Sequence, residues 1–338
     1  MKKNSVRFIA SIAGGILIGL GLFALAANFI FSNNGSDVEP TANPSPTLTR
    51  EGETGPIKVV TSTRVWADIA EVLGGSWVEV QVIVPDNQDP HSYEATARDQ
   101  LAIFEADLVI ANGGGYDEFM DQLVSAANTD LVFLKLVEGK HIHAGESEVT
   151  HEEHSHDHSA EANEHIWYDF ALTLEAAEHI VEAIVELRPE AFDASTAGFD
   201  FFSSELANLE IRLEALREKA LGLGFVAPEG VANLMLLNAG FENMTPEEMA
   251  DAIEEERDVP LTALDEAKNL LRNKVAVLLV VNANTQDAVS DQLIAAAEAG
   301  QRSIVKMGET AAAASPDQDL DYLDWMSLVL DQLQEAIY

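Results

Sequence analysis

Residues 57–84 read IKVVTSTRVWADIAEVLGGSWVEVQVIV, and this stretch carries the pattern of a strand, a helix and a second strand. Apolar residues dominate 57–61, and 65–73 (VWADIAEVL) has the spacing of an amphipathic helix. Two glycines then break the helix, after which apolar residues alternate along 78–84. Strands that alternate with helices in this way predict a parallel sheet covered by helices on both faces.

The same alternation recurs in both halves of the chain. In the first half a helix is predicted at 97–105 and a buried strand at 108–111, and in the second half the run VAVLLVV at 275–281 predicts another buried strand. Further elements are predicted as helices at 171–187, 232–239, 246–252 and 288–299 and as a strand at 303–307. The expected fold class is therefore α/β, with two lobes that each contain a mainly parallel sheet flanked by helices.

A long helix is predicted between the two halves. Apolar residues recur at helical spacing from Phe199 to Leu221, including Leu206 and Leu213. A helix of this length, about 23 residues, would extend roughly 35 Å at 1.5 Å per residue. It is long enough to join two lobes rigidly as a single backbone helix. The alternative is an ordinary surface helix of one lobe.

These patterns divide the chain into successive parts. Residues 33–56 are rich in Pro, Ser, Thr, Asn and Gly and lack apolar periodicity, which is typical of a flexible tether. The predicted parts are an N-terminal membrane anchor or signal at 1–32, the tether at 33–56, an N-terminal lobe at 57–188 with a His-rich loop at 141–158, a linking helix at 189–222 and a C-terminal lobe at 223–338.

The N-terminal segment indicates where the protein resides. Residues 8–31 contain no charged side chain and are long enough for a bilayer-spanning helix, which needs roughly 20 residues. The preceding Lys2, Lys3 and Arg7 should remain cytoplasmic. We therefore expect a cell-surface or extracytoplasmic protein, tethered to the cytoplasmic membrane by residues 8–31. The alternative is secretion after cleavage near 24–26 (ALA), which resembles a signal-peptidase site.

Composition excludes several function classes. The chain has 58 acidic and 19 basic residues, a formal net charge of −39, which would repel nucleic acid from most of the surface. We therefore expect no nucleic-acid partner. The absence of cysteine from the sequence excludes disulfides, thiolate metal sites and a cysteine nucleophile.

Two polar residues follow predicted strands at positions suited to a ligand. His91, in DPHSYE at 89–94, comes shortly after the strand at 78–84, and Glu309, in KMGETA at 306–311, comes after the strand at 303–307. In open parallel sheets, ligands bind beyond the carboxyl ends of the strands. Both residues are therefore expected where a cleft would lie.

Histidines are concentrated in the middle of the chain. Imidazoles and carboxylates at this density are typical ligands of borderline divalent metals such as zinc, and a solvated polar loop is the alternative. His165 follows in NEHIWYD, where a buried core histidine is the alternative to a ligand. The six histidines of the 141–158 segment are His141, His143, His151, His154, His156 and His158.

The ordered set of motifs resembles a known family. DPHSYEATARDQLAIFEADLVIANGGGYDEF, an acidic His-rich loop, NEHIWYD, APEGVANLMLLNAGFENMTPEEM and KMGETA follow one another in this chain. This order is similar to that of the cluster A-I solute-binding proteins of zinc and manganese ABC transporters, over about residues 57–337. The resemblance implies two α/β lobes joined by one long helix, with a single metal ion between the lobes. It implies ligands at His91, His165, Glu229 in APEG and Glu309.

The resemblance also implies a function. A protein of this kind captures a divalent metal ion and delivers it to an ABC transporter permease. Two imidazoles and two carboxylates would neutralise a divalent ion and leave no open position for an activated water, which favours binding over catalysis. We expect Zn²⁺, with Mn²⁺ as the alternative. A surface metal buffer or adhesin remains open, and a zinc hydrolase is disfavoured because the sequence contains no HExxH pair.

Overall fold

The computed structural model describes residues 55–337, except 87, 128–130, 138–139, 144–162, 256, 286 and 317. The predicted anchor at 8–31 and most of the tether lie outside the described residues. Among the helices that are described, none is long and apolar enough to cross a membrane. The described residues form two separate sheets, as the sequence predicts.

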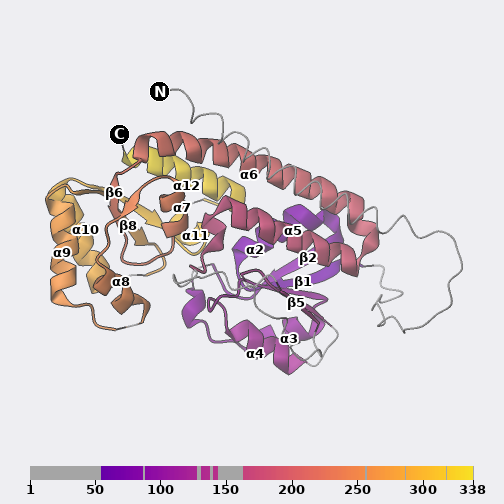
Figure 1. Ribbon diagram of the computed structural model, residues 1–338. Coiled ribbons are helices and arrows are strands. Elements are labelled where there is room, and N and C mark those ends of the chain that lie inside the picture. The colour runs from indigo at the N-terminus through magenta and orange to yellow at the C-terminus, as the bar shows by residue number, and fades with distance from the viewer. Residues whose placement is uncertain are drawn as a thin grey trace, which may run out of the picture. The chain divides into compact units, whose positions relative to one another are not determined.

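The N-terminal lobe is built on a five-stranded sheet with the order β2-β1-β3-β4-β5 (Figure 1). The first four strands are parallel, and β5 pairs antiparallel with β4. Helices α3 and α4 cover one face, and α2 and α5 cover the other (Figure 1). The strands are β1 (Ile57–Thr61), β2 (Val78–Val82), β3 (Leu108–Ala111), β4 (Val132–Lys135) and β5 (Lys140–His143), and the helices are α2 (Arg64–Gly74), α3 (Ala97–Glu105), α4 (Phe119–Ala127) and α5 (Phe170–Leu187).

The C-terminal lobe is built on a parallel four-stranded sheet with the order β7-β6-β8-β9. Apolar residues of α8, α9 and α10 share one core cluster with β6 and β8. The strands are β6 (Gly224–Val226), β7 (Glu242–Asn243), β8 (Ala276–Asn282) and β9 (Ser303–Met307), and the helices are α7 (Asn233–Asn238), α8 (Glu247–Glu254), α9 (Leu261–Arg272), α10 (Ala288–Gly300), α11 (Ala311–Ala314) and α12 (Tyr322–Ala336). The predicted fold class is confirmed.

One 29-residue helix, α6 (Phe192–Ala220), connects the lobes. It packs against α2 and α5 of the first lobe and against α12 of the second (Figure 1). At 1.5 Å per residue α6 is about 43 Å long, which exceeds the roughly 35 Å expected from the sequence. The helix is longer because it begins at Phe192, seven residues before the predicted Phe199 and directly after a turn at Pro189–Ala191. Arg212 ties α6 to α12 through hydrogen bonds to the hydroxyl and carbonyl of Ser327, at 2.6 and 3.0 Å.

Gly198 permits the close approach of α6 to α2. A Cβ atom at this position would lie 2.5 Å from the carbonyl oxygen of Val72 and 3.0 Å from the Cα of Leu73. Since both contacts are with backbone, we expect Gly198→Ala to lower the free energy of unfolding by about 1–3 kcal/mol, a typical cost of overpacking. Urea denaturation measures this, and Ser204→Ala, at an exposed position of the same helix, is the control. An unchanged midpoint in Gly198→Ala would contradict the close packing.

The ionisation of Asp68 on α2 lowers the stability of the fold as the pH rises. Burial raises its pKa from 3.8 to about 7, with nearby acids adding to the rise and Arg64, 4.0 Å away, opposing it. The folded state therefore holds this proton more tightly than the unfolded state, and stability decreases as pH rises from about 4 to 7. The acids that contribute to the raised pKa are Glu71, Asp321 and Asp86.

We expect Asp68→Asn, which resembles the protonated acid, to stabilise the fold at pH 8 by about 2 kcal/mol. This is roughly half of what the shift is worth at 1.36 kcal/mol per pKa unit, since Asp68 is not fully shielded from solvent. Below pH 4 the variant and the wild type should be equally stable. Urea denaturation at both pH values checks this, and a gain of equal size at both would show that ionisation is not its cause.

The predicted His-rich loop requires a correction at its start. His141 and His143 lie on β5, where the backbone pairs with Leu134 and Val132 of β4. The antiparallel pairing supplies hydrogen bonds that the composition of the segment does not reveal. The other four histidines of the segment, His151, His154, His156 and His158, lie outside the described residues.

Candidate metal centre

His91 is presented by a short, firmly held turn. Asp89 caps the 3-10 turn Pro90–Ser92, and its Oδ1 accepts a hydrogen bond from the backbone N–H of His91 at 2.9 Å. The imidazole packs edge-on against the ring of Tyr116, with the ring centroids 4.9 Å apart. The His91 side chain remains 41% exposed, so it reaches solvent as well as the site.

His165 is buried, and Asn163 determines its tautomer. The amide Nδ2 of Asn163 donates to the carbonyl oxygen of Gly230 at 2.7 Å, and its Oδ1 accepts from the backbone N–H of His165 at 2.9 Å. The same Oδ1 lies 3.0 Å from Nδ1 of His165. Because Oδ1 can only accept, Nδ1 must carry the proton of the neutral ring. Nε2 is thereby left as the atom available to a metal.

A buried carboxylate faces that nitrogen. Glu309 is 1% exposed, and its Oε2 lies 3.2 Å from Nε2 of His165. Among the described residues Nε2 has no partner with hydrogen-bond geometry. Two electron-rich atoms this close need a cation between them, either a proton or a metal ion.

The pKa shifts of His165 and Glu309 also indicate that a cation is needed between the two side chains. Burial raises the pKa of Glu309, but the charges of His165 and His91 outweigh it, and the net shift is downward. Burial lowers the pKa of His165, but Glu309 and further carboxylates outweigh it, and the net shift is upward. Without metal the site therefore favours a proton on the imidazole and a charged carboxylate. A divalent ion that binds here would displace that proton.

Glu229 joins the site through Asn282. The loop after β6 carries Glu229, whose Oε2 accepts hydrogen bonds from Asn282 Nδ2 at 2.6 Å and from Thr285 Oγ1 at 3.1 Å. Asn282 Nδ2 also donates to Glu309 Oε1 at 3.1 Å, so one amide holds both carboxylates. Burial raises the pKa of Glu229, and the neighbouring Glu309 adds to the rise.

The structure brings the four predicted ligands close together, each through different contacts. His165 approaches Glu309 directly, the ring of His91 lies 6.1 Å from that of His165, and Glu229 shares a donor with Glu309. Side chains of the His-rich segment are not among those described, including those of His141 and His143 on β5.

The predicted site residues do not include several side chains that contribute to the candidate centre. Tyr116 donates its hydroxyl to Glu309 Oε2 at 3.2 Å, and Asn282 bridges the carboxylates. Glu164 groups with His91 and His165, with one ligand atom of each within 4.8 Å of the others. Asn282 ends strand β8, a position that the strand-end rule could have identified, whereas the contacts of Tyr116 and Asn163 depend on the fold.

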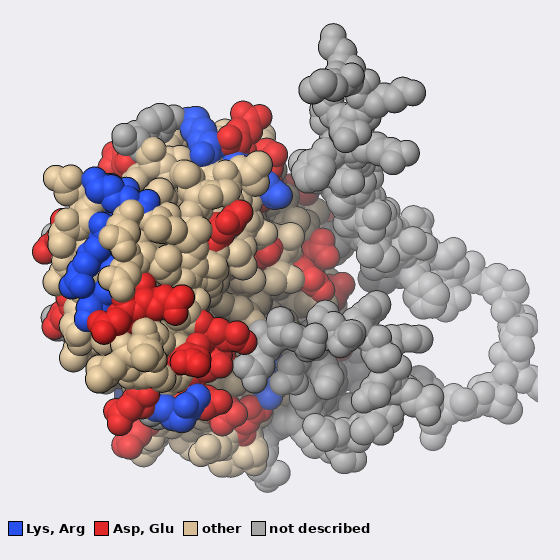
Figure 2. Space-filling model, turned by 60° about the vertical axis from the view of Figure 1, so that its left-hand side comes forward, with Lys and Arg blue, Asp and Glu red and all other residues tan. Residues whose placement is uncertain are grey.

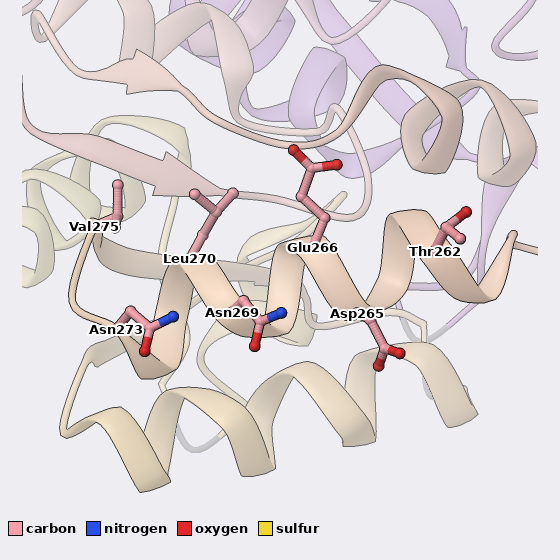
Figure 3. Close-up of a pocket in the computed structure, with 7 residues that line it drawn as sticks. All are labelled: Thr262, Asp265, Glu266, Asn269, Leu270, Asn273 and Val275. Carbon is pink, nitrogen blue, oxygen red and sulfur yellow. The ribbon is translucent and has the colours of Figure 1, made fainter.

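One surface hollow lies away from the candidate centre. A hollow of about 440 Å³ runs along α9 and is lined by polar and apolar side chains without an imidazole (Figure 3). None of the predicted ligands lines it. Acidic side chains form several separate groups on the face shown in Figure 2 rather than one continuous patch. Neither feature competes with the buried centre as a metal site.

The same two-lobe fold occurs in solved structures of other proteins. A similar solved structure is the periplasmic zinc-binding protein TroA from Treponema pallidum, with a TM-score of 0.64 over 84% of this chain and 99% of that chain. At 17% identity this likeness concerns the fold alone. The chain belongs to the family described as zinc-uptake complex component A, periplasmic (ZnuA), whose pattern matches residues 59–336.

Curated relatives match over part of their length. The manganese-binding lipoprotein MntA of Halalkalibacterium halodurans is 27% identical over 155 residues, which are 46% of this chain and 47% of that protein. The high-affinity zinc uptake system protein ZnuA of Yersinia pestis is 28% identical over 184 residues, which are 49% of this chain and 58% of that protein. The chain thus spans about half the length of these relatives in the alignments, and their names refer to different metals.

Proposed function

We propose that this protein is an extracytoplasmic solute-binding protein that captures a divalent metal ion and delivers it to an ABC permease. The observation that carries this proposal is the pair of Glu309 and His165. A buried carboxylate lies 3.2 Å from an imidazole nitrogen whose ring proton is held on the opposite side by Asn163. This arrangement is suited to a cation and is costly without one.

The proposed ligands are His91, His165, Glu229 and Glu309. Two neutral imidazoles and two carboxylates balance the charge of a divalent ion. Because these four ligands would complete a tetrahedral shell, the site is suited to stoichiometric binding rather than to activating a water for hydrolysis. The protein is therefore proposed to be a carrier and not an enzyme.

Zinc is the proposed cargo, with manganese as the alternative. Imidazole ligands suit zinc, and intrinsic affinity for a site of nitrogen and oxygen ligands is higher for zinc than for manganese. The names of the relatives support both metals. A chelator-competition titration of the full-length protein in detergent should give one tight site per chain, with zinc bound more tightly than manganese. A protein without a tight site for either ion would contradict the proposal.

The same proposed function implies where the protein resides and what the parts of the chain do. Residues 8–31 would tether the protein to the cytoplasmic membrane, or direct its secretion if cleaved, and leave the lobes at 57–188 and 223–338 outside. The linking helix proposed at 189–222 is supported by α6.

Delivery requires its own test, since a surface metal buffer would also bind zinc. Deleting the gene should slow the uptake of radioactive zinc from dilute medium, and the intact gene should restore it. An unchanged uptake rate would contradict delivery and would show that the protein only binds the metal ion.

A further inference from the structure

Glu164 lies against both imidazoles of the candidate centre. Its Oε1 is 3.8 Å from Nε2 of His91 and 3.8 Å from Nδ1 of His165. These distances are too long for hydrogen bonds. They are close to the spacing of two ligands on one ion, which is about 3.4 Å for a tetrahedral zinc with bonds of about 2.0–2.2 Å. A side-chain shift of a few tenths of an ångström would let Glu164 and His91 share a metal ion.

The backbone of Glu164 is fixed, and its carboxylate is available. Its carbonyl oxygen accepts hydrogen bonds from Asn112 Nδ2 at 2.9 Å and from the backbone N–H of Ile166 at 2.8 Å. Within the described part of the chain, the carboxylate takes part in no hydrogen bond, and only the two imidazoles lie within ion-pair distance of it. The peptide is therefore anchored beside the site while the side chain can adjust to an arriving ion.

Exposure gives the site an outer and an inner half. The side chains of His91 and Glu164 are 41% and 26% exposed, whereas those of His165 and Glu309 are 7% and 2% exposed. An ion that arrives from solvent meets the exposed pair first. Nδ1 of His165 is already held by Asn163, so this ring offers its other nitrogen to the inner half.

We propose that Glu164 and His91 form an outer ligand pair that takes the metal ion from solvent, and that His91 keeps the ion as it moves from Glu164 to His165, Glu229 and Glu309. This inference rests on the proposed function and adds a fifth ligand to it. Glu229 and Glu309 already balance a divalent charge, so Glu164 is not needed to neutralise the seated ion. Its negative charge instead attracts the hydrated ion and raises the association rate.

The test compares Glu164→Gln with wild type and with Glu79→Gln, each as full-length protein in detergent. Glutamine keeps the size of the side chain and removes its charge, and Glu79 is an exposed carboxylate on β2 that provides the same charge change. Stopped-flow measurements with Zn²⁺ at low ionic strength should show an association rate about tenfold lower in Glu164→Gln and unchanged in Glu79→Gln. A thermal melt without metal verifies that each variant is folded.

The dissociation rate defines the role further. When association is slower, an unchanged dissociation rate in Glu164→Gln shows a ligand used only during capture, and a faster one shows that Glu164 also contributes to holding the seated ion; both support the proposal. A wild-type association rate in Glu164→Gln would overturn it, whatever the dissociation rate. If His165→Ala then still abolished binding, the proposed function would stand without the outer pair, whereas a wild-type protein that binds no zinc would overturn both.

Discussion

Replacement of His165 by alanine is expected to weaken zinc binding at least 100-fold. The variant removes the nitrogen that faces Glu309 across 3.2 Å. Loss of an outer-shell partner of a metal ligand typically costs 10- to 100-fold in affinity, and loss of a ligand itself should cost more. Chelator-competition titration of the full-length protein measures the dissociation constant.

His179→Ala is the matched control for this prediction. His179 lies on α5 with its Nδ1 3.6 Å from Glu182, away from the candidate centre, and its replacement should change the affinity by less than about twofold, as expected for independent sites. If His165→Ala retained wild-type affinity, the metal would have to bind elsewhere.

Trp167→Ala is expected to lower the free energy of unfolding by about 3–5 kcal/mol, the usual cost of removing a large aromatic side chain from a core. Trp167 is completely buried, and its ring packs edge-on against Trp66, Tyr116 and His165, with centroids 6.5, 5.1 and 5.1 Å away. The variant should therefore also loosen the support of the His165 ring. Urea denaturation without metal measures the first effect, and zinc affinity measures the second.

Phe104→Ala supplies the comparison for that loss. Phe104 is an aromatic residue of the same lobe but is 59% exposed, so its removal should cost less than about 0.5 kcal/mol. Equal losses in the two variants would show that Trp167 does not have the central packing role that its burial implies.

Much of the fold can be predicted because local and tertiary preferences agree. The predicted bounds of β1, α3, β3 and β9 are confirmed. Helix α3 begins where Thr96 and Asp99 form a capping box, a signal that is fully local. Strand β6 has only three residues and depends on its neighbours β7 and β8 for its pairing, so its apolar pattern is too short to identify it.

The candidate site is predictable only where position along a strand indicates it. His91 and Glu309 follow parallel strands, and the structure places both at the candidate centre. The role of Asn163 depends on a hydrogen bond to Gly230, 67 residues further along the chain, which no spacing in the sequence reveals. Glu164 adjoins His165 in the sequence, but only the fold brings its carboxylate to His91 as well.

A crystal structure of the zinc complex, with the ion located by its anomalous scattering, tests the account most directly. We predict one zinc ion between the lobes, within about 2.0–2.2 Å of nitrogens from His91 and His165 and of carboxylate oxygens from Glu229 and Glu309. Zinc bound only by histidines of the 141–158 segment, with His165 and Glu309 still in direct contact, would contradict it.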